Sequence, residues 1–491
     1  MARRATVVGS GPNGLAAAVA LARAGYEVRV LEASSTIGGG TRTAELTLPG
    51  FRHDVGSAVH PAALSSPFFR AFGLRERIEW IVPEVSFAQP LDPLSTGDPR
   101  AAIAWHDLDR TAEGLGRDAS TWRAVVRPLT RHLDAVVDFT GHQLLRMPRH
   151  PVTTIRFGLR ALQLGTALAN LTWRTQEGAA LFAGVVAHAN RSLPDVGAAA
   201  SALFLIAHAH ARDGWAYPRG GAQAIADELV ADLQTHGGVV EPDTFVGSLD
   251  RLDWGDPDTG DLLLLDTSPR LALTHPDIPV RYARAIRRYR YGQAAAKVDY
   301  ALDGPVPWAH PDVAASPTVH LGGTREEVEA SENAVAAGRM SDRPYVLTVQ
   351  PSVLDDTRAP AGKQTLWAYV HVPSGSTLDP TELVTRQVER FAPGFRDRIL
   401  ASAAMPAAER AAFNPSDIGG DILGGAFTFA QAFRRPVLST TPWRTPMRGV
   451  YLASASTPPG PGVSGMAGWY AARQALSDFA GVPIELDDLF G

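Results

Sequence analysis

The sequence predicts a mixed α/β chain in which a parallel-sheet domain is joined to a second domain of mixed sheet and helices. Three observations support this fold class. An apolar strand at the N-terminus runs through a glycine-rich turn into an alanine-rich helix at residues 15–24, and a second strand follows at 27–31. Residues 262–265 are apolar at every position, as in a strand buried on both faces. Helical patterns fill 119–210, whereas 290–375 reads as strands joined by long connections.

The turn after the first strand carries the pattern Gly9-x-Gly11-x-x-Gly14. These glycines permit a tight turn, close approach of the backbone to a pyrophosphate, and close packing of the helix on the strand. The pyrophosphate then lies at a helix N-terminus, where free N–H groups and the helix dipole favour negative charge. The second strand ends at Glu32, 18 residues after Gly14, the spacing expected for a carboxylate that binds ribose hydroxyls rather than a 2′-phosphate. The segment is therefore predicted to be a Rossmann-type dinucleotide-binding unit.

The composition is that of a soluble globular protein, with 491 residues of which 45% are hydrophobic and 20% charged. The formal net charge is −5 and there is no long basic run, so we expect no nucleic-acid partner. The absence of cysteine excludes disulfides and thiolate chemistry. His208 and His210 would lie on different faces of a helix, so we expect no metal site there. We interpret the N-terminus as that of a mature cytoplasmic protein without a membrane span.

Two further glycine-rich turns bear on the same site. The turn at 38–42 directly follows the acidic strand end and includes an arginine, so it is suited to wrap a diphosphate and to neutralise part of its charge. Near the C-terminus, Gly460-x-Gly462-x-x-Gly465 repeats the dinucleotide pattern. Only 26 residues follow Gly465, too few for a second nucleotide-binding half. We interpret this turn as a second helix N-terminus directed at the same cofactor.

Four motifs occur in a characteristic order: the first turn with its acidic strand end, the turn at 38–42, the Tyr-Pro-Arg-Gly-Gly run at 217–221, and the stretch 451–468. In this order they resemble the phytoene-dehydrogenase-like flavoproteins, a branch of the class that includes amine oxidases and carotenoid desaturases. The resemblance covers nearly the whole chain. Residues 366–373 and 414–421 are similar to stretches of uncharacterised bacterial and mitochondrial members.

The resemblance implies FAD, bound non-covalently and extended. Residues of the first turn would bind the pyrophosphate, the acidic strand end would bind the adenosine ribose, and the C-terminal turn would lie at the pyrimidine edge of the flavin. Ser454 and Pro461 depart from the glycines that relatives usually have at these positions. The expected cofactor-binding residues are Gly9, Ser10, Gly11, Pro12, Asn13, Gly14, Glu32, Ala33, Gly39, Gly40, Thr41, Arg42, Val246, Ser454, Gly462, Val463 and Met466.

The same resemblance implies a discontinuous FAD-binding domain. We expect residues 1–75, 215–285 and 440–491 to build that domain. Residues 76–214, which contain the helical insertion, and 286–439 would build the substrate domain.

The activity expected from the resemblance is that of an FAD-dependent dehydrogenase or desaturase acting on an isoprenoid- or lipid-like substrate, with oxygen or a quinone as electron acceptor. A flavin-dependent isomerase or saturase of a polyene and an amine oxidase are rival enzymatic activities. A flavin-free chaperone that binds lipid or prenyl chains is the rival from a different class. We assign no catalytic residue. His60 and His371 are candidates for moving a proton, and a hydrogen-bonded structural role is the favoured interpretation of both.

One helical segment permits two interpretations. Residues 155–171 are largely apolar, with Arg156 and Arg160 one turn apart. Such a segment is either a helix buried in the domain or an amphipathic surface that contacts a membrane. Peripheral membrane contact is therefore an expectation alongside the cytoplasmic location.

Overall fold

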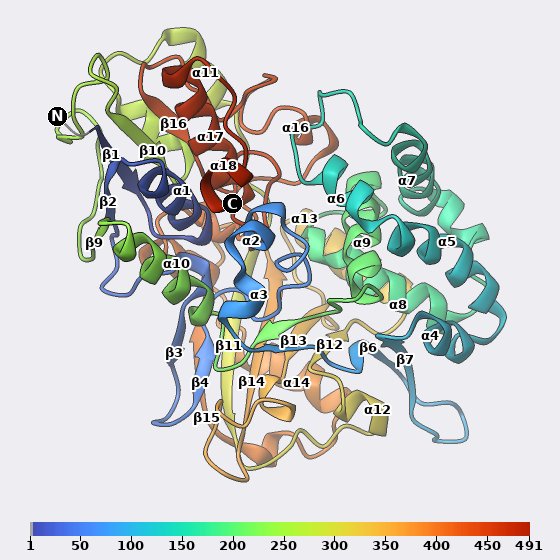
Figure 1. Ribbon diagram of the computed structural model, residues 1–491. Coiled ribbons are helices and arrows are strands. Elements are labelled where there is room, and N and C mark those ends of the chain that lie inside the picture. The colour runs from blue at the N-terminus through green and yellow to red at the C-terminus, as the bar shows by residue number, and fades with distance from the viewer. Residues whose placement is uncertain (1–2) are drawn as a thin grey trace.

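The computed structural model describes residues 3–491, and a parallel sheet of five strands organises its first domain (Figure 1). The strand order is β9-β2-β1-β10-β16, so the N-terminal strand lies in the centre and the remaining strands come from three separate parts of the chain. Because every pairing in this sheet is parallel, all five carboxyl ends share one edge. The strands are β1 (Arg4–Val8), β2 (Glu27–Leu31), β9 (Val239–Glu241), β10 (Leu262–Leu265) and β16 (Val450–Leu452).

Three helices cover one face of this sheet: α1 (Pro12–Arg23), α10 (Gln223–Thr235) and α17 (Met466–Ala480). Helix α1 is alanine-rich and buried on all sides, which lets both neighbours approach its backbone. The approach is closest at Gly468 of α17, where an added Cβ would lie 1.8 Å from the carbonyl oxygen of Asn13. The two helix N-termini are therefore adjacent.

A mixed sheet of seven strands organises the second domain, in the order β15-β11-β14-β13-β12-β6-β7. Its pairings are antiparallel except that between β12 and β6. One face packs against α14 (Thr381–Phe391) and α12 (Pro311–Ala314). The strands are β6 (Val85–Leu91), β7 (Arg100–Trp105), β11 (Ala294–Leu302), β12 (Thr318–Leu321), β13 (Val346–Val349), β14 (Gln364–Val372) and β15 (Ile399–Met405).

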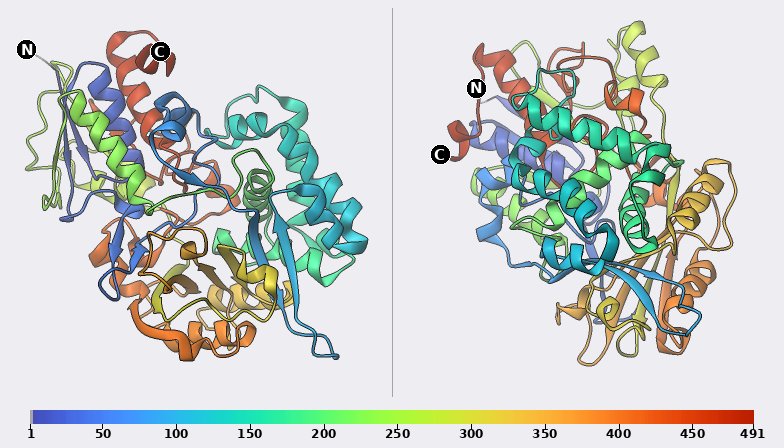
Figure 2. Two further views of the ribbon diagram at one scale, coloured as in Figure 1. Left: turned by 60° about the horizontal axis from the view of Figure 1, so that its bottom comes forward. Right: turned by 90° about the vertical axis from the view of Figure 1, so that its right-hand side faces the viewer.

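A bundle of helices covers the other face of the mixed sheet and forms with it a large buried core (Figure 2). Helix α9 is central, because it packs against α5, α7 and α8 together. The bundle consists of α4 (Leu108–Gly114), α5 (Ala119–Arg131), α6 (Leu133–Thr140), α7 (Pro151–Leu164), α8 (Gln176–Val186) and α9 (Val196–Ala209).

Smaller elements connect the two domains. Strand β8 follows the helical bundle in the chain and pairs antiparallel with β5, which precedes the mixed sheet. The remaining elements are β3 (Thr43–Glu45), β4 (Arg52–Asp54), α2 (Pro67–Phe72), α3 (Leu74–Arg77), β5 (Trp80–Ile81), β8 (Tyr217–Pro218), α11 (Val280–Arg287), α13 (Arg325–Ala336), α15 (Ala407–Phe413), α16 (Phe429–Ala432) and α18 (Asp487–Phe490).

The predicted fold class is confirmed, and the differences are local. Phe245 and Val246, whose aromatic and β-branched side chains favour a strand, are irregular and follow a segment that is hydrogen-bonded to the end of β2. Helix α7 ends at Leu164, and a separate 3₁₀ turn spans Ala167–Leu171. Between them Gly165 packs so closely on Val196 that an added Cβ would lie 2.4 Å from the Val196 Cα. The domain boundaries stay a prediction. Over residues 3–491, no helix is long and apolar enough to cross a bilayer.

Candidate cofactor and substrate site

The carboxyl edge of the parallel sheet gathers the residues that end its strands. Gly9 follows β1, Glu32 follows β2, and Asp266 follows β10, which is the neighbour of β1 on its other side. Ser454 comes two residues after β16, beyond Ala453, whose N–H donates to the carbonyl of Leu265. In a sheet of this kind the crevice at the carboxyl ends beside the central strand is where ligands bind.

The first glycine turn is too crowded for side chains. Gly9 has φ +101°, and an added Cβ at Gly14 would lie 2.3 Å from the Gly9 carbonyl oxygen. An added Cβ at Gly11 would lie 2.5 Å from Oδ2 of Asp266. Gly11 is also the N-cap of α1, and it offers no capping side chain. The N-terminal end of α1 and its dipole therefore lie at the sheet edge, the arrangement that favours anions, although Pro12 has no N–H and the Gly14 N–H already donates to Asp266.

Glu32 connects the first and second glycine turns. Its Oε2 accepts hydrogen bonds from the Ser10 backbone N–H at 2.9 Å and from Ser10 Oγ at 2.5 Å, and its Oε1 accepts from the N–H of Ser34 at 2.8 Å. Ser10 Oγ in turn accepts from the N–H of Gly38 at 3.0 Å. The buried carboxylate thus stabilises the loops in addition to its expected contact with a ribose.

The second turn lies directly against the first. Gly38 and Gly39 have φ +118° and +52°, and an added Cβ at Gly39 would lie 2.9 Å from the Cα of Gly11. Gly40 is exposed, and an added Cβ there would have open space around it. Thr41 is buried and donates to the Gly38 carbonyl at 2.7 Å. The two turns therefore form one continuous backbone cradle.

Arg42 stabilises this cradle through hydrogen bonds to the loop that forms it. Its Nε donates to the Gly39 carbonyl at 2.9 Å, its Nη1 donates to Ser34 Oγ at 2.7 Å, and its guanidinium lies 3.9 Å from the ring centroid of Phe413. Burial lowers its pKa, an effect that the nearby carboxylates of Glu32 and Asp417 oppose. The arginine predicted to cover a diphosphate is thus already engaged in shaping the loop.

Asp266 is a site residue that sequence reasoning missed. Its Oδ2 accepts a hydrogen bond from the Gly14 N–H at 2.8 Å, beneath the first turn of α1. Complete burial raises the pKa of this carboxyl well above its usual range and nearby Glu32 raises it further, while the N–H groups of Gly14 and Gly11 oppose the shift. Asp266 therefore holds a proton more readily than an ordinary aspartate. An acidic residue at the end of a fully apolar strand was the available signal.

The C-terminal turn reaches the same place. Gly462 is exposed with φ +130°, Val463 is half-buried, and Met466 begins α17 behind the N-cap Gly465. Ser66 Oγ donates to the Ser464 carbonyl at 2.6 Å and so fastens the turn to α2. Because α17 packs on the first turn of α1, the N-termini of both helices face one region.

The remaining predicted residues lie around this region. Pro12 and Asn13 form the first turn of α1, and Ala33 is exposed just after β2. Val246 comes two residues after Thr244, whose N–H donates to the Glu32 carbonyl at 2.7 Å. Ser454 is buried, and its Oγ accepts from the N–H of Ser456.

A second group of polar side chains lies where the mixed sheet meets the helical bundle. His320 of β12 and His188, in a short 3₁₀ turn after α8, meet through their Nε2 atoms at 2.9 Å. His371 of β14 lies with its Nδ1 2.9 Å from both carboxylate oxygens of Glu332 of α13. Trp367 and Tyr369 precede His371 at alternate positions of β14, with ring centroids 5.2 Å apart and planes at 86°. Alternation along a strand puts these three side chains on one face.

Hydrogen bonds connect this second group to the glycine cradle. The Gly40 carbonyl accepts from the Ser57 N–H at 2.9 Å, and Ser57 Oγ lies 3.0 Å from His60 Nε2. The His60 N–H donates to the Ala216 carbonyl at 2.8 Å. The neighbouring Trp215 then packs edge-on against His188 at 6.1 Å between ring centroids. We call the side chains of this second group the aromatic wall: His188, Trp215, His320, Trp367, Tyr369 and His371. Through Ser57 and His60, the aromatic wall is connected to Gly40 at the second glycine turn.

Buried charges lie at the other end of the wall. Lys297 and Asp299 of β11 form an ion pair, and the Lys297 ammonium is 5.7 Å from the ring centroid of Trp367. Burial raises the pKa of Asp299 to about 6, although Lys297 opposes the shift. Burial, with Lys297 and then Arg358, lowers the pKa of His53 to about 3. His53 is therefore neutral beside this pair.

The other histidines considered from the sequence have structural partners. Burial lowers the pKa of His60, His208 and His210 to about 4 in each case. His208 Nε2 lies 2.7 Å from Ser65 Oγ, and His210 Nε2 accepts from the indole N–H of Trp122 at 3.3 Å. In the part of the chain that the structure describes, no three histidine, aspartate or glutamate side chains are grouped to hold a metal.

The glycine cradle at the edge of a parallel sheet defines a dinucleotide-binding Rossmann-like domain, and a model of the NAD(P)-binding Rossmann-like domain matches residues 7–72. A rat relative, "Pyridine nucleotide-disulfide oxidoreductase domain-containing protein 2", is 26% identical over 561 residues and covers 96% of this chain and 93% of its own. An oxidoreductase from Methanosarcina mazei aligns with TM-score 0.61 at 15% identity, over 97% and 100% of the two chains. A putrescine oxidase triple mutant aligns with TM-score 0.61 at 16% identity, over 98% and 99%. The chain thus has the two-domain fold of these oxidoreductases along nearly its whole length.

Proposed function

We propose that the protein is an FAD-dependent oxidoreductase of the phytoene-dehydrogenase-like type, which removes a hydride from a hydrophobic, isoprenoid- or lipid-like substrate. The observation that carries this proposal is the contact between the two glycine turns beside two helix N-termini. A mononucleotide would need only the first turn. A cradle that continues through Gly40 and Ser57 to an aromatic wall suits an extended dinucleotide whose reactive ring lies at the far end.

The residues present fit FAD. The positive end of the α1 dipole and the backbone of the two glycine turns would bind the diphosphate, and the crowding at Gly11 and Gly39 leaves that surface free of side chains. The N-terminus of α17 would favour negative charge at the pyrimidine edge of the flavin. FAD supplies the acceptor for a hydride when it is bound. The protein would orient it, exclude water from the reacting carbon and accept the accompanying proton.

The substrate side of the site favours a neutral, apolar molecule. Trp367 and Tyr369 offer aromatic surface, and both are buried against the helical bundle. A cation bound by Trp367 would compete with the ammonium of Lys297, which already occupies a position near that ring. This arrangement weighs against a primary amine as substrate, although the fold is shared with a putrescine oxidase.

His371 is the candidate for accepting the proton. With Glu332 accepting from its Nδ1–H, the lone pair of a neutral imidazole lies on Nε2. Among the described residues this Nε2 atom has no hydrogen-bond partner. Dehydrogenation of a C–C bond releases one hydride and one proton, and the Nε2 lone pair would receive the latter.

The visible spectrum of the purified protein tests the proposal. Absorption bands near about 370 and 450 nm, retained or restored by FAD, would establish the cofactor. We expect anaerobic addition of an extract of prenyl and polyene lipids to bleach the band near 450 nm and diamines to leave it unchanged. Bleaching by amines alone would replace the proposal with amine oxidation.

Two further outcomes would assign the protein a different activity on lipids. Lipid conversion only after reduction of the flavin with dithionite would indicate a saturase or isomerase. A protein that binds no FAD and still retains prenyl lipid would be a flavin-free lipid carrier.

A further inference from the structure

Helix α7 has two separate apolar faces. Phe157, Ala161 and Leu164 form a stripe that packs into the core of the helical bundle. Val152, Ile155, Leu159 and Leu162 form a second stripe on the outer face, with exposed fractions of 70%, 62%, 61% and 49%. The structure therefore buries one side of this helix in the bundle and leaves an apolar stripe exposed on the opposite side.

The outer stripe lies in the part of the chain where exposed large hydrophobic side chains are concentrated. Single exposed hydrophobic residues are normal on soluble proteins, whereas a contiguous patch marks an interaction site. Of the 19 large hydrophobic side chains exposed in the described residues, eight lie between positions 145 and 171. We call this surface the α7 patch; its members are Leu145, Met147, Val152, Ile155, Leu159, Leu162, Leu168 and Leu171.

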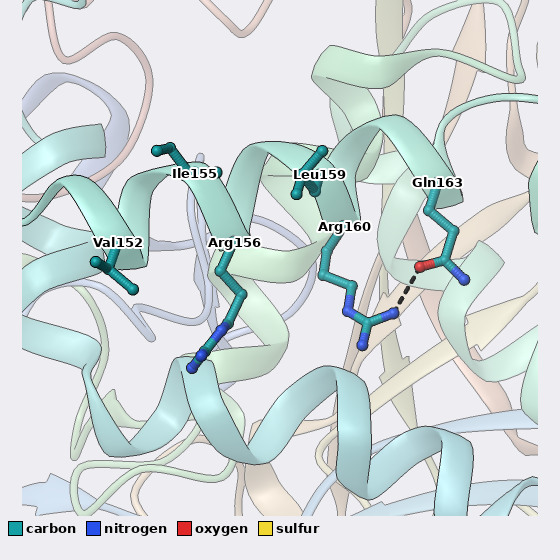
Figure 3. A pocket seen from close by; sticks show the side chains of 6 residues that line it. All are labelled: Val152, Ile155, Arg156, Leu159, Arg160 and Gln163. Atoms are coloured by element: carbon teal, nitrogen blue, oxygen red, sulfur yellow. Dashed lines mark hydrogen bonds between the residues drawn. The ribbon is translucent and has the colours of Figure 1, made fainter.

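The segment that carries the α7 patch has charge of one sign along the chain, and Asp138, just before it, pairs with Arg146 and Arg149. Residues 139–176 contain five arginines and neither aspartate nor glutamate, in a chain whose formal net charge is −5. Arg156 and Arg160 extend from the same flank of α7 and form with Ile155 and Leu159 the walls of a shallow groove (Figure 3). Over residues 3–491, no carboxylate forms an ion pair with Arg156 or Arg160.

A second basic helix shows that this combination is specific to α7. Residues 281–290, which span most of α11 and the three residues after it, also include five arginines and no acidic residue. There the core-facing residues are Ala283 and Ile286, and Val280 is the exposed large hydrophobic side chain of that helix. Positive charge alone is thus found elsewhere on the protein, while positive charge beside a broad apolar face is found at α7.

We propose that the α7 patch docks on the surface of a lipid bilayer that contains anionic headgroups. The helix would lie in the plane of the interface, with its outer stripe among the acyl chains and Arg156 and Arg160 at the level of the phosphates. A second copy of the chain is a poorer occupant, because a symmetric contact through this patch would bring the arginines of both copies together. The inference extends the proposed function and does not depend on it.

Docking in this orientation would bring the substrate domain to the lipid. Helix α9 packs on α7 from within and also contacts the 3₁₀ turn that carries His188. The bundle between the bilayer and the aromatic wall is therefore about two helices deep, roughly 20 Å at the usual spacing of packed helices. Docking would therefore place the substrate domain against the lipid.

Flotation of the whole 491-residue protein with vesicles tests the docking. One set of vesicles is pure phosphatidylcholine and the other also contains phosphatidylglycerol. We expect the protein to bind the anionic vesicles and to bind more weakly as salt is added. Ile155→Glu/Leu159→Glu should weaken this binding about tenfold or more, because it places two carboxylates in the apolar stripe. Arg156→Glu/Arg160→Glu should weaken binding to the anionic vesicles most.

Matched control variants separate the α7 patch from general charge. Val280→Glu/Leu400→Glu adds the same two charges at exposed apolar positions of α11 and β15, and Arg281→Glu/Arg284→Glu reverses two arginines of α11. Both should bind vesicles as the wild type does. The substituted side chains are exposed, except Arg160, which is half-buried and donates to Gln163. Thermal unfolding of all four variants should match that of the wild type, and it is measured on the same preparations.

Three results would overturn the inference. They are a wild-type protein that binds neither kind of vesicle, control variants that lose binding as much as the α7 variants do, and a dimer in sedimentation analysis that Ile155→Glu/Leu159→Glu converts to a monomer. The last result would assign the α7 patch to contact between copies of the chain.

Discussion

The two halves of the site are built by different means. At the edge of the parallel sheet, the cradle consists of backbone that glycines leave uncovered, within three short stretches of sequence. At the mixed sheet, the wall consists of side chains from a 3₁₀ turn, two strands and a helix that are far apart in the chain. A site for a common ligand can thus be predicted from the spacing of glycines in the sequence. A site for a particular substrate depends on how distant segments pack against one another.

The strongest effect should come from the backbone half. Gly14→Val places a Cβ 2.3 Å from the Gly9 carbonyl oxygen, so the turn or the start of α1 must shift. We expect loss of bound flavin and a decrease of about 1–3 kcal/mol in the free energy of unfolding. The ratio of flavin to protein absorbance and denaturant titration measure the two effects. Full flavin content in this variant would show that the cradle does not hold the cofactor.

The next effect tests the side-chain half. His371→Gln removes the Nε2 lone pair that we propose as the proton acceptor, and turnover with the hydrophobic substrate should fall about 10²–10⁴-fold. Flavin content should stay unchanged, because β14 lies outside the cradle. Rapid-reaction measurement of flavin bleaching reports the rate directly. His208→Gln is the matched control, since His208 is also buried and bonded to Ser65, and its turnover should stay within about twofold of wild type.

A weaker effect is expected at Gly40, where the protein itself leaves room for a side chain and only a bound cofactor would be obstructed. Gly40→Ala adds a Cβ into open space at a residue whose φ is not positive, so the free energy of unfolding should change by less than about 0.5 kcal/mol. If the flavin lies against this backbone, the FAD dissociation constant should still rise about tenfold. Equilibrium dialysis with FAD measures it, and an unchanged constant would show that the cofactor does not approach Gly40.

The weakest effect concerns the two acidic residues that flank β10. Burial raises the pKa of Asp266, so above about pH 4 the unfolded chain loses a proton that the native state keeps. Because of Asp266, the free energy of unfolding therefore decreases as the pH rises toward the native pKa of this residue. Asp266→Asn keeps an acceptor for the Gly14 N–H and should flatten this decline in a series of melting temperatures from about pH 4 to 8.

Asp261 makes stability depend on pH in the opposite direction to Asp266. Burial would raise its pKa, but the N–H groups of Arg4 and Asp256 outweigh burial and hold it below its usual value. Its contribution to stability is present above the unfolded pKa and is lost as pH falls through the native pKa. Asp261→Asn should therefore lower the melting temperature at neutral pH, where Asp266→Asn should raise it. Equal pH profiles for the two variants would contradict both assignments.

Much of the fold could be predicted because its signals are local. The strand at 27–31 has the predicted bounds, since it belongs to the local strand–turn–helix–strand pattern of the dinucleotide-binding unit. Strand β15 was missed because its burial alternates only between partly and fully exposed positions at a sheet edge. Helix α13 was missed although it carries a capping box at Thr324 and Glu327, a signal that the sequence contained.

The candidate site divides in the same way. The glycines, Glu32 and the turn at 38–42 could be named in advance because a phosphate-binding loop needs those residue types at those spacings. Asp266 could not be placed, since its contact with Gly14 joins residues 252 positions apart. His371 was already a candidate from its apolar strand, and the structure adds the partner that orients it, Glu332 on a helix that was not predicted.

Local patterns in the chain were sufficient for the parallel sheet, the dinucleotide cradle and the class of fold, because hydrophobic period and glycine spacing act over a few neighbouring residues. The three-dimensional packing was needed to learn which side chains line the wall beyond the cradle and which face of α7 is left exposed. Those outcomes depend on side-chain packing between segments up to hundreds of residues apart, and packing of that kind has no local pattern from which it can be read.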